Sequence, residues 1–187
     1  MSLILPQPAE NVPVTMVRDH LDNIPQYKLP PPYTFRPYQP GDEQIWFDIH
    51  RLADQFNPIT LALFFQEFGD NPVGLAERQF YLCAGDGEAV GTATAWFNTY
   101  HGQPYGQVHW VAIVPPEQGY GLAKPLLTVI CNRLRDLGHE RAFLITGTAR
   151  IPAINLYRQF GFVPDMSSPQ EEQTWRAIQP HLGKRPD

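Results

Sequence analysis

Cysteine is scarce in this chain, since only Cys83 and Cys131 occur among its 187 residues. Cys83 lies in an apolar strand pattern and Cys131 in a helix pattern, which is typical of buried, reduced thiols. Two such thiols do not form the disulfide framework of a small secreted domain. The cysteine content therefore favours a cytoplasmic protein.

Long apolar runs and an excess of positive charge are also missing. No segment approaches the ~20 apolar residues of a membrane span, and Leu3-Ile4-Leu5 ends at Pro6 without the basic flank of a signal peptide. We therefore expect no membrane partner. The formal net charge of -5 argues against nucleic acid as the main partner. With 43% hydrophobic and 18% charged residues, the composition is that of a soluble globular protein.

Proline is abundant instead and is unevenly distributed. Seven of the 20 prolines lie in residues 1–32, which favours extended or irregular structure there. We expect a Pro-rich N-terminal extension over residues 1–32 and a folded domain over residues 33–187, with a C-terminal helix from about residue 169. Within the extension, Val12 to Val17 could add a strand at the edge of a sheet.

From Tyr33 onward, strand and helix patterns follow one another in the order β-α-α-β-β-β-α-β-α-β. Gly85-Asp86-Gly87 favours a hairpin in the middle of this order, and Pro40-Gly41-Asp42 is typical of a helix start. The expected strands cover residues 33–38, 80–84, 88–97, 106–114, 141–146 and 162–163, with a loop over 98–105. The expected helices cover residues 42–56, 59–68, a short segment from Pro72, 123–137 and 152–160.

The segment Gln118-Gly-Tyr-Gly-Leu-Ala-Lys124 joins a strand to a helix through two glycines. A helix start has N–H groups without intrahelical partners and a partial positive charge. Gly119 and Gly121 keep side chains away from these groups, so the segment predicts a phosphate cradle with free donors from Gln118 to Lys124. A Walker loop needs Ser or Thr after its lysine, where this chain has Pro125, and a dinucleotide fingerprint needs glycine at position 124.

Two motifs resemble signatures of the GCN5-related N-acetyltransferase (GNAT) superfamily. Gln118-Gly-Tyr-Gly-Leu-Ala123 is similar to its Q/R-x-x-G-x-G/A loop, and Ile113-Val-Pro115 resembles the V-x-P strand end before it. Ala153 to Phe162 is similar to the second signature, A-I-x-L-Y-x-x-x-G-F. The resemblance spans residues 33–163 and implies an α+β acetyltransferase fold in α/β/α layers, a mixed central sheet with splayed strands flanked by helices.

The resemblance implies acetyl-CoA as cosubstrate, bound without a metal. Many relatives have asparagine where this chain has Arg150, so Arg150 could tie the helix start, reach a phosphate or face the acceptor. Contacts of Val111 and Ile113 with the cofactor would use the backbone. The implied cofactor-binding residues are Val111, Ala112, Ile113, Gln118, Gly119, Tyr120, Gly121, Leu122, Ala123, Lys124 and Arg150.

Two residues are candidates for catalysis. Tyr157 matches the tyrosine that protonates the departing thiolate in the family. His109 has a side chain suited to accept a proton near neutral pH, and its position is similar to one of the paired histidines of serotonin N-acetyltransferases. Strand alternation would place Gln107, His109, Val111 and Ile113 on one face. A purely structural role for His109 stays open, as do His101, Glu117 or a water chain as the base.

The expected function is direct acetyl transfer to a primary amine of a small molecule or peptide. A non-catalytic acyl-CoA-binding sensor or scaffold is the alternative, and a longer acyl chain or a hydroxyl acceptor would use the same site. The family allows a homodimer. Asp54 or Glu67 could attract a cationic amine, but the acceptor is not identified. The resemblance places it beside Trp46, His50, Asp54, Phe56, Phe64, Phe65, Phe68, Tyr100 and His101.

Overall fold

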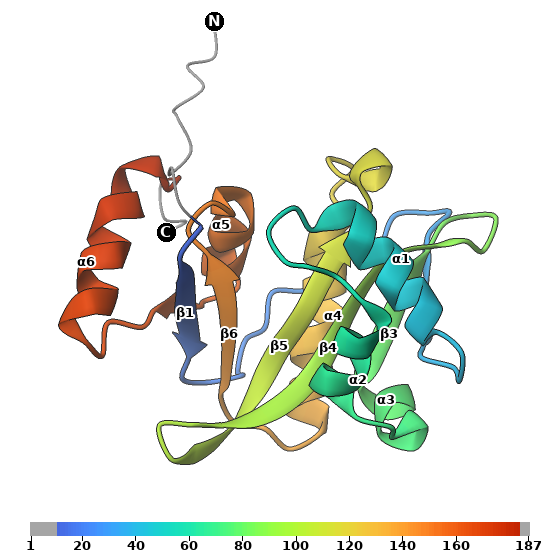
Figure 1. Ribbon diagram of the computed structural model, residues 1–187, viewed down its shortest axis with the longest axis horizontal. Coiled ribbons are helices and arrows are strands. Elements are labelled where there is room, and N and C mark those ends of the chain that lie inside the picture. The colour runs from blue at the N-terminus through green and yellow to red at the C-terminus, as the bar shows by residue number, and fades with distance from the viewer. Residues whose placement is uncertain (1–10, 184–187) are drawn as a thin grey trace, which may run out of the picture.

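A computed structural model describes residues 11–183. Seven strands form one mixed sheet in the order β2-β3-β4-β5-β6-β1-β7 (Figure 1). The strands are β1 (Pro13–Arg18), β2 (Thr34–Pro37), β3 (Gln79–Cys83), β4 (Ala89–Tyr100), β5 (Gln103–Ile113), β6 (Ala142–Gly147) and β7 (Val163–Pro164). The helices are α1 (Glu43–Ala53), α2 (Leu61–Phe68), α3 (Pro72–Arg78), α4 (Ala123–Asp136), α5 (Ile151–Gln159) and α6 (Pro169–Ile178), with short 3₁₀ turns at Pro115–Glu117 and Gln179–His181.

Helices cover both faces of the sheet, and each face has its own core. On one face, α1, α2 and α3 bury an aromatic cluster that includes Trp46, Phe64 and Phe68. On the other face, α4, α5 and α6 contribute residues such as Leu126, Ile154 and Trp175 to a second core. This is the α+β arrangement of a mixed, helix-flanked sheet that the sequence predicts. None of the helices in residues 11–183 is both long and apolar enough to cross a membrane.

Strand β1 lies inside the sheet, although the sequence suggested an edge strand. It pairs antiparallel with β6 along all six of its residues and with β7 on its other side. In Figure 1 it runs directly beside β6. Val14 and Met16 are buried in the core beneath α4, α5 and α6. A strand pattern reports which residues are buried but not which neighbours pair with it, so its place could not be read locally.

Truncating Met16 should therefore destabilise the whole domain. Met16 is fully buried, and we expect Met16→Ala to lower the free energy of unfolding by about 2–4 kcal/mol because it leaves a cavity. Thr15→Ala, one residue away on the opposite face, should cost less than about 1 kcal/mol. Urea denaturation measures both. A loss below about 0.5 kcal/mol for Met16→Ala would mean that β1 is a dispensable attachment.

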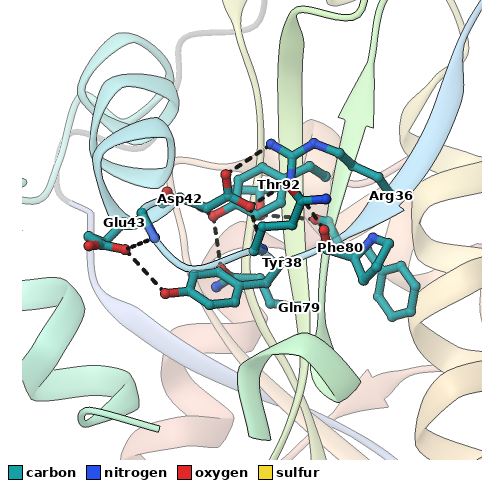
Figure 2. Close-up of polar contacts among 11 residues, drawn as sticks. Arg36, Tyr38, Asp42, Glu43, Gln79, Phe80 and Thr92 are labelled. Atoms are coloured by element: carbon teal, nitrogen blue, oxygen red, sulfur yellow. Dashed lines mark hydrogen bonds and ion pairs between the residues drawn. The ribbon is translucent and has the colours of Figure 1, made fainter. Parts of the chain in front are cut away.

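The start of α1 is anchored to the sheet by Asp42 (Figure 2). Its carboxylate accepts hydrogen bonds from both guanidinium nitrogens of Arg36, at 2.6 and 3.0 Å, and from the backbone N–H of Gln39 at 2.7 Å. Asp42 occupies the N-cap position without a side-chain hydrogen bond to the helix, so its expected capping role is replaced by this ion pair. From this start, α1 packs on β4 and β5 in the middle of the sheet.

The loop expected over residues 98–105 is mostly strand. Strands β4 and β5 continue to a turn at His101 and Gly102, where both residues have positive φ, 48° and 71°. Two-residue hairpin turns with this backbone match the twist of the strands they join. The hairpin carries Tyr100 and His101 to Asp165, which accepts a hydrogen bond from the Tyr100 hydroxyl and lies 3.3 Å from Nε2 of His101.

Candidate active site

Strands β5 and β6 separate and open a cleft. They pair in parallel at only two positions, Gly106 with Ala142 and Gln107 with Phe143, and then diverge (Figure 1). The resulting cleft has a volume of about 570 Å³. Its walls come from β5, the end of β6, the end of α1 and the first turns of α5. The divergence leaves backbone groups of β5 beyond Gln107 without a β6 partner, so they are available to a ligand.

The glycine loop lies between β5 and α4. Gly119 and Gly121 have φ of 87° and 78°, a backbone region that other residues adopt only with strain. Among the described residues, no hydrogen-bond acceptor is seen for the N–H groups of Gly119, Tyr120 and Gly121. These donors precede the first turn of α4, where the helix dipole favours an anion.

One donor of this loop differs from the prediction, and two side chains of the loop contact other segments. The N–H of Gln118 donates to Pro115 at 3.2 Å, so this donor is not free, because the preceding prolines form a 3₁₀ turn that uses it. The side chain of Gln118 donates to the carbonyl of Ile113 at 2.8 Å and ties the loop to the end of β5. The ammonium of Lys124 lies 5.0 Å from the centre of the Tyr27 ring, on the N-terminal segment.

A β-bulge in β5 changes the side of the sheet that the side chains after it face. Thr94 of β4 pairs with His109 and Thr92 with Ala112, so Trp110 and Val111 together oppose one residue. Trp110 has a φ of 47°. The extra residue resets the alternation of the strand. His109, Trp110 and Ala112 face α1 and α2, whereas Val111 and Ile113 pack on the opposite core. The expectation that His109, Val111 and Ile113 share a face is therefore wrong.

His109 is held between two polar side chains. Its Nε2 lies 2.8 Å from Oε2 of Glu67, at the end of α2, and its Nδ1 lies 3.1 Å from Nε2 of Gln107. A carboxylate has no hydrogen to donate, so Nε2 of His109 carries the hydrogen, and Nδ1 accepts one from Gln107. The same Glu67 oxygen accepts from Nε1 of Trp110 at 3.0 Å. The hydrogen bond from His109 lowers the pKa of Glu67 below its ordinary value, against the opposing effect of burial.

The sequence did not indicate that Glu67 would meet His109. The two residues are 42 positions apart, and the sequence predicts for Glu67 only an attraction for cationic amines. Nothing in the local pattern of α2 distinguishes it from a solvated helix glutamate. Its partner is set by the packing of α2 on β5 and by the bulge that turns Trp110 to the same side.

The floor of the cleft includes a neutral histidine. His50 is buried against the rings of Trp46 and Trp110, with ring centres 4.3 and 5.1 Å away. Burial lowers its pKa to about 3, so it is uncharged at neutral pH. Nε2 of His50 and Oε1 of Gln107 are buried and have no hydrogen-bond partner among the described residues. Both residues line the cleft.

Arg150 and Asp54 close one wall of the cleft. One guanidinium nitrogen of Arg150 lies 2.8 and 2.9 Å from the two carboxylate oxygens of Asp54, and the guanidinium stacks on Phe56. Asp54 also accepts from the backbone N–H groups of Phe56 and Asn57. These bonds end α1 at Ala53, three residues before the expected Phe56, because Asp54 adopts an extended conformation.

Tyr157 projects from α5 into the cleft wall. Its side chain is buried, and burial raises its pKa to about 12. No hydrogen bond of its hydroxyl is seen among the described residues. The hydroxyl is therefore protonated at neutral pH and free to donate to a ligand.

The other residues that the sequence suggested for the site are divided between the cleft and the rest of the fold. His101 contacts Asp165 at the β4–β5 turn, and Glu117 accepts a hydrogen bond from the Tyr33 hydroxyl at 2.5 Å. Among the proposed acceptor contacts, His50, Asp54 and Phe56 line the cleft. Trp46, Phe64 and Phe68 belong to the aromatic core, and Phe65 points outward. Cys83 and Cys131 are both buried.

The model of the acetyltransferase (GNAT) family matches residues 28–162, which is most of the chain. The chain belongs to the GNAT family. A mycothiol acetyltransferase from Pseudarthrobacter chlorophenolicus is 31% identical over 152 residues, covering 75% of this chain and 45% of the relative. The chain thus spans about half the length of the curated relatives that it matches.

Solved structures share the GNAT fold. A GCN5-related N-acetyltransferase from Sphaerobacter thermophilus superposes with a TM-score of 0.66 at 23% identity, covering 83% of this chain and 49% of that one. The ribosomal-protein-S18-alanine N-acetyltransferase from Escherichia coli superposes with a TM-score of 0.57 at 21% identity, covering 70% and 77%. At these identities the likeness concerns the fold alone.

Proposed function

We propose that this chain is an acetyl-CoA-dependent N-acetyltransferase that acts in the cytoplasm on a primary amine. The observation that carries the proposal is the cleft between β5 and β6, with the glycine loop near its β5 side and Tyr157 on its wall. The loop supplies donors for a pyrophosphate, and the unpaired edge of β5 supplies backbone groups for an amide-containing arm. The mycothiol acetyltransferase relatives favour a small-molecule acceptor over a peptide.

The donor side of the site follows from the loop and β5. We assign the pyrophosphate to the segment from Gln118 to Lys124, with Gly119, Tyr120 and Gly121 as the principal donors. Backbone groups of Val111, Ala112 and Ile113 would hold the arm, since this part of β5 has no partner in β6. Arg150 contributes to the wall through its ion pair with Asp54.

The transfer forms a bond between the amine nitrogen and the thioester carbonyl carbon and breaks the bond from that carbon to sulfur. The amine loses a proton and the departing thiolate gains one. Tyr157, which remains protonated, is the group that we assign to protonate the thiolate. Backbone N–H groups of β5 near the bulge would stabilise the negative charge on the carbonyl oxygen, an effect worth a few kcal/mol.

We assign His109 as the base that receives the amine proton. Glu67 fixes its Nε2–H, which leaves the lone pair on Nδ1 as the basic position. Gln107 donates to that lone pair in the unliganded site. The amine, or a water in contact with it, would have to replace the Gln107 amide at Nδ1 for the proton to pass.

Two measurements test the function. Calorimetry should show acetyl-CoA binding, and thiol release in the presence of a primary amine should exceed hydrolysis without it. Binding without thiol release across a broad amine panel would favour the sensor or scaffold, and release from hydroxyl compounds alone would make the chain an O-acyltransferase. Absence of binding at millimolar acetyl-CoA would contradict all of these functions.

A further inference from the structure

The lining of the cleft carries more negative than positive charge, which bears on the choice of acceptor. Among the described residues that line it, the acidic side chains are Asp54 and Glu67, and Arg150 is the one arginine or lysine. His50 is neutral there because burial lowers its pKa to about 3. Two carboxylates thus face one guanidinium, and the lining carries an excess of negative charge. Such a lining favours a cationic ligand and disfavours an anionic one.

The single guanidinium is already neutralised. Arg150 contacts both oxygens of Asp54, and the Asp54 side chain is only 6% exposed. The backbone N–H groups of Phe56 and Asn57 and the amide of Asn57 hold the same carboxylate in place. Only one guanidinium nitrogen makes these contacts, but a substrate carboxylate at the other nitrogens would lie beside the Asp54 carboxylate, whose negative charge offsets the attraction of Arg150.

Glu67, in contrast, has acceptor capacity to spare. Both of its bonds, from His109 and from Trp110, end on Oε2. Among the described residues no hydrogen bond reaches Oε1, and the side chain is 31% exposed at the cleft. The ammonium group of an amine can donate to this free oxygen while His109 and Trp110 hold the carboxylate still.

Two other residues that line the cleft add acceptors. The free Nε2 of His50 and the free Oε1 of Gln107 belong to residues that are 2% and 4% exposed. A buried acceptor without a partner is costly, and a donor from the ligand would remove that cost. A carboxylate offers no donor to either atom. The site therefore matches a group rich in hydrogens on nitrogen and mismatches an anion.

We infer that the acceptor is a primary amine with no carboxylate beside its amino group, and that Glu67 binds its ammonium form. The inference deepens the proposed acetyl transfer and rests on it. It assigns Glu67 a binding role distinct from the proton transfer of His109. Free amino acids, which carry a carboxylate two bonds from the amine nitrogen, are the substrates that this arrangement rejects.

Matched acceptors test this selectivity. Tyrosine and tyrosine amide have nearly the same shape but differ in charge, and serine and serine amide form a second pair without a ring. Tyramine, whose amine is no less basic than that of tyrosine, controls for amine basicity. We expect kcat/KM for tyramine and the amides to exceed that of the free amino acids by at least about 10-fold. Equal use, equal refusal, or preference for the amino acids would overturn the inference.

Two substitutions test which residues produce this acceptor selectivity. Glu67→Gln should raise KM for tyramine about 10-fold while the acetyl-CoA Kd stays within about twofold. The glutamine has no negative charge for the ammonium group, whereas its amide oxygen can still accept the hydrogen bonds from His109 and Trp110. Asp54→Asn should leave the charge of Arg150 without its internal counter-ion. The ratio of kcat/KM for tyrosine amide to kcat/KM for tyrosine should then fall by at least about fivefold. Asp48→Asn is the matched control, since Asp48 lies on α1, just before Asp54 in the chain, but is 51% exposed and 4.0 Å from Arg51.

The outcomes separate this inference from the proposed function. Acetyl-CoA binding with a kcat/KM for free amino acids equal to that for tyramine and the amides would support the acetyltransferase and contradict the selectivity. An unchanged KM in Glu67→Gln would remove the residue from acceptor binding. Absence of acetyl-CoA binding would instead contradict the acetyltransferase itself.

Discussion

Tyr157→Phe should lower kcat by about 10²- to 10³-fold, the range expected when a general acid is lost. The substitution removes only the hydroxyl, and the ring keeps its packing against Phe162. Because burial raises the pKa of Tyr157 to about 12, the wild-type hydroxyl stays protonated through neutral and mildly alkaline pH. Its ionisation should therefore cause no decline of kcat between pH 7 and about 10. Steady-state thiol release over this range measures both effects.

The matched control for this experiment is Tyr105→Phe. Tyr105 lies on β5 near the hairpin turn, with its ring against Tyr100 and Phe143 and outside the lining of the cleft. Removal of the Tyr105 hydroxyl should leave kcat within about twofold of the wild-type value, because the residue has no role in the cleft. Acetyl-CoA affinity should be nearly unchanged in both variants. A kcat for Tyr157→Phe equal to that of the wild type would exclude Tyr157 as the proton donor.

Gly121→Val should weaken acetyl-CoA binding by about 10- to 100-fold. Gly121 has a φ of 78°, and a β-branched residue at positive φ is strained by about 1–3 kcal/mol. Relief of this strain would turn the neighbouring N–H groups away from the positions that a pyrophosphate needs. Calorimetric titration with acetyl-CoA and with CoA measures the loss, which should be equal for the two ligands because they share the pyrophosphate.

Gly138→Val separates cofactor binding from general strain. Gly138 also has a positive φ, 86°, with open space around the position of a Cβ, but it follows α4 at the end opposite the loop. Both valine variants should lose similar amounts of stability in urea. Only Gly121→Val should lose affinity. Equal affinities in the two variants would contradict a cradle at the glycine loop.

Features that depend on a few consecutive residues were accessible from the sequence. Glycines at 119 and 121 before a helix predict free N–H groups, and those of Gly119, Tyr120 and Gly121 have no acceptor among the described residues. The order of elements from Tyr33 onward likewise follows from periodicity, because each helix or strand must bury one side wherever it lies. Similarity to two GNAT motifs was sufficient to predict a mixed, helix-flanked sheet with splayed strands.

The predicted orientation of side chains was wrong where one inserted residue changes the side of the sheet that the following residues face. The bulge at Trp110 reverses the side of the sheet that Val111 and Ile113 face. Strict alternation cannot reveal an inserted residue. The strand expected at an edge over Val12 to Val17 is likewise misplaced, since β1 pairs on both sides within the sheet. Strand pairing depends on distant partners, and the N-terminal segment carries no local sign of them.

The sequence by itself determined the glycine loop and the order of the elements, since these depend on backbone preferences over short stretches of chain. It also determined the family, because two short motifs were sufficient to recognise it. The tertiary structure alone decided that Glu67 meets His109, that Asp54 neutralises Arg150, and that Tyr157 stands free in the cleft. These contacts join residues far apart in the chain, with 42 positions between Glu67 and His109 and 96 between Asp54 and Arg150. Their geometry exists only once two helices have packed on a sheet that splays, so the charges that would select the acceptor could not be paired from the sequence.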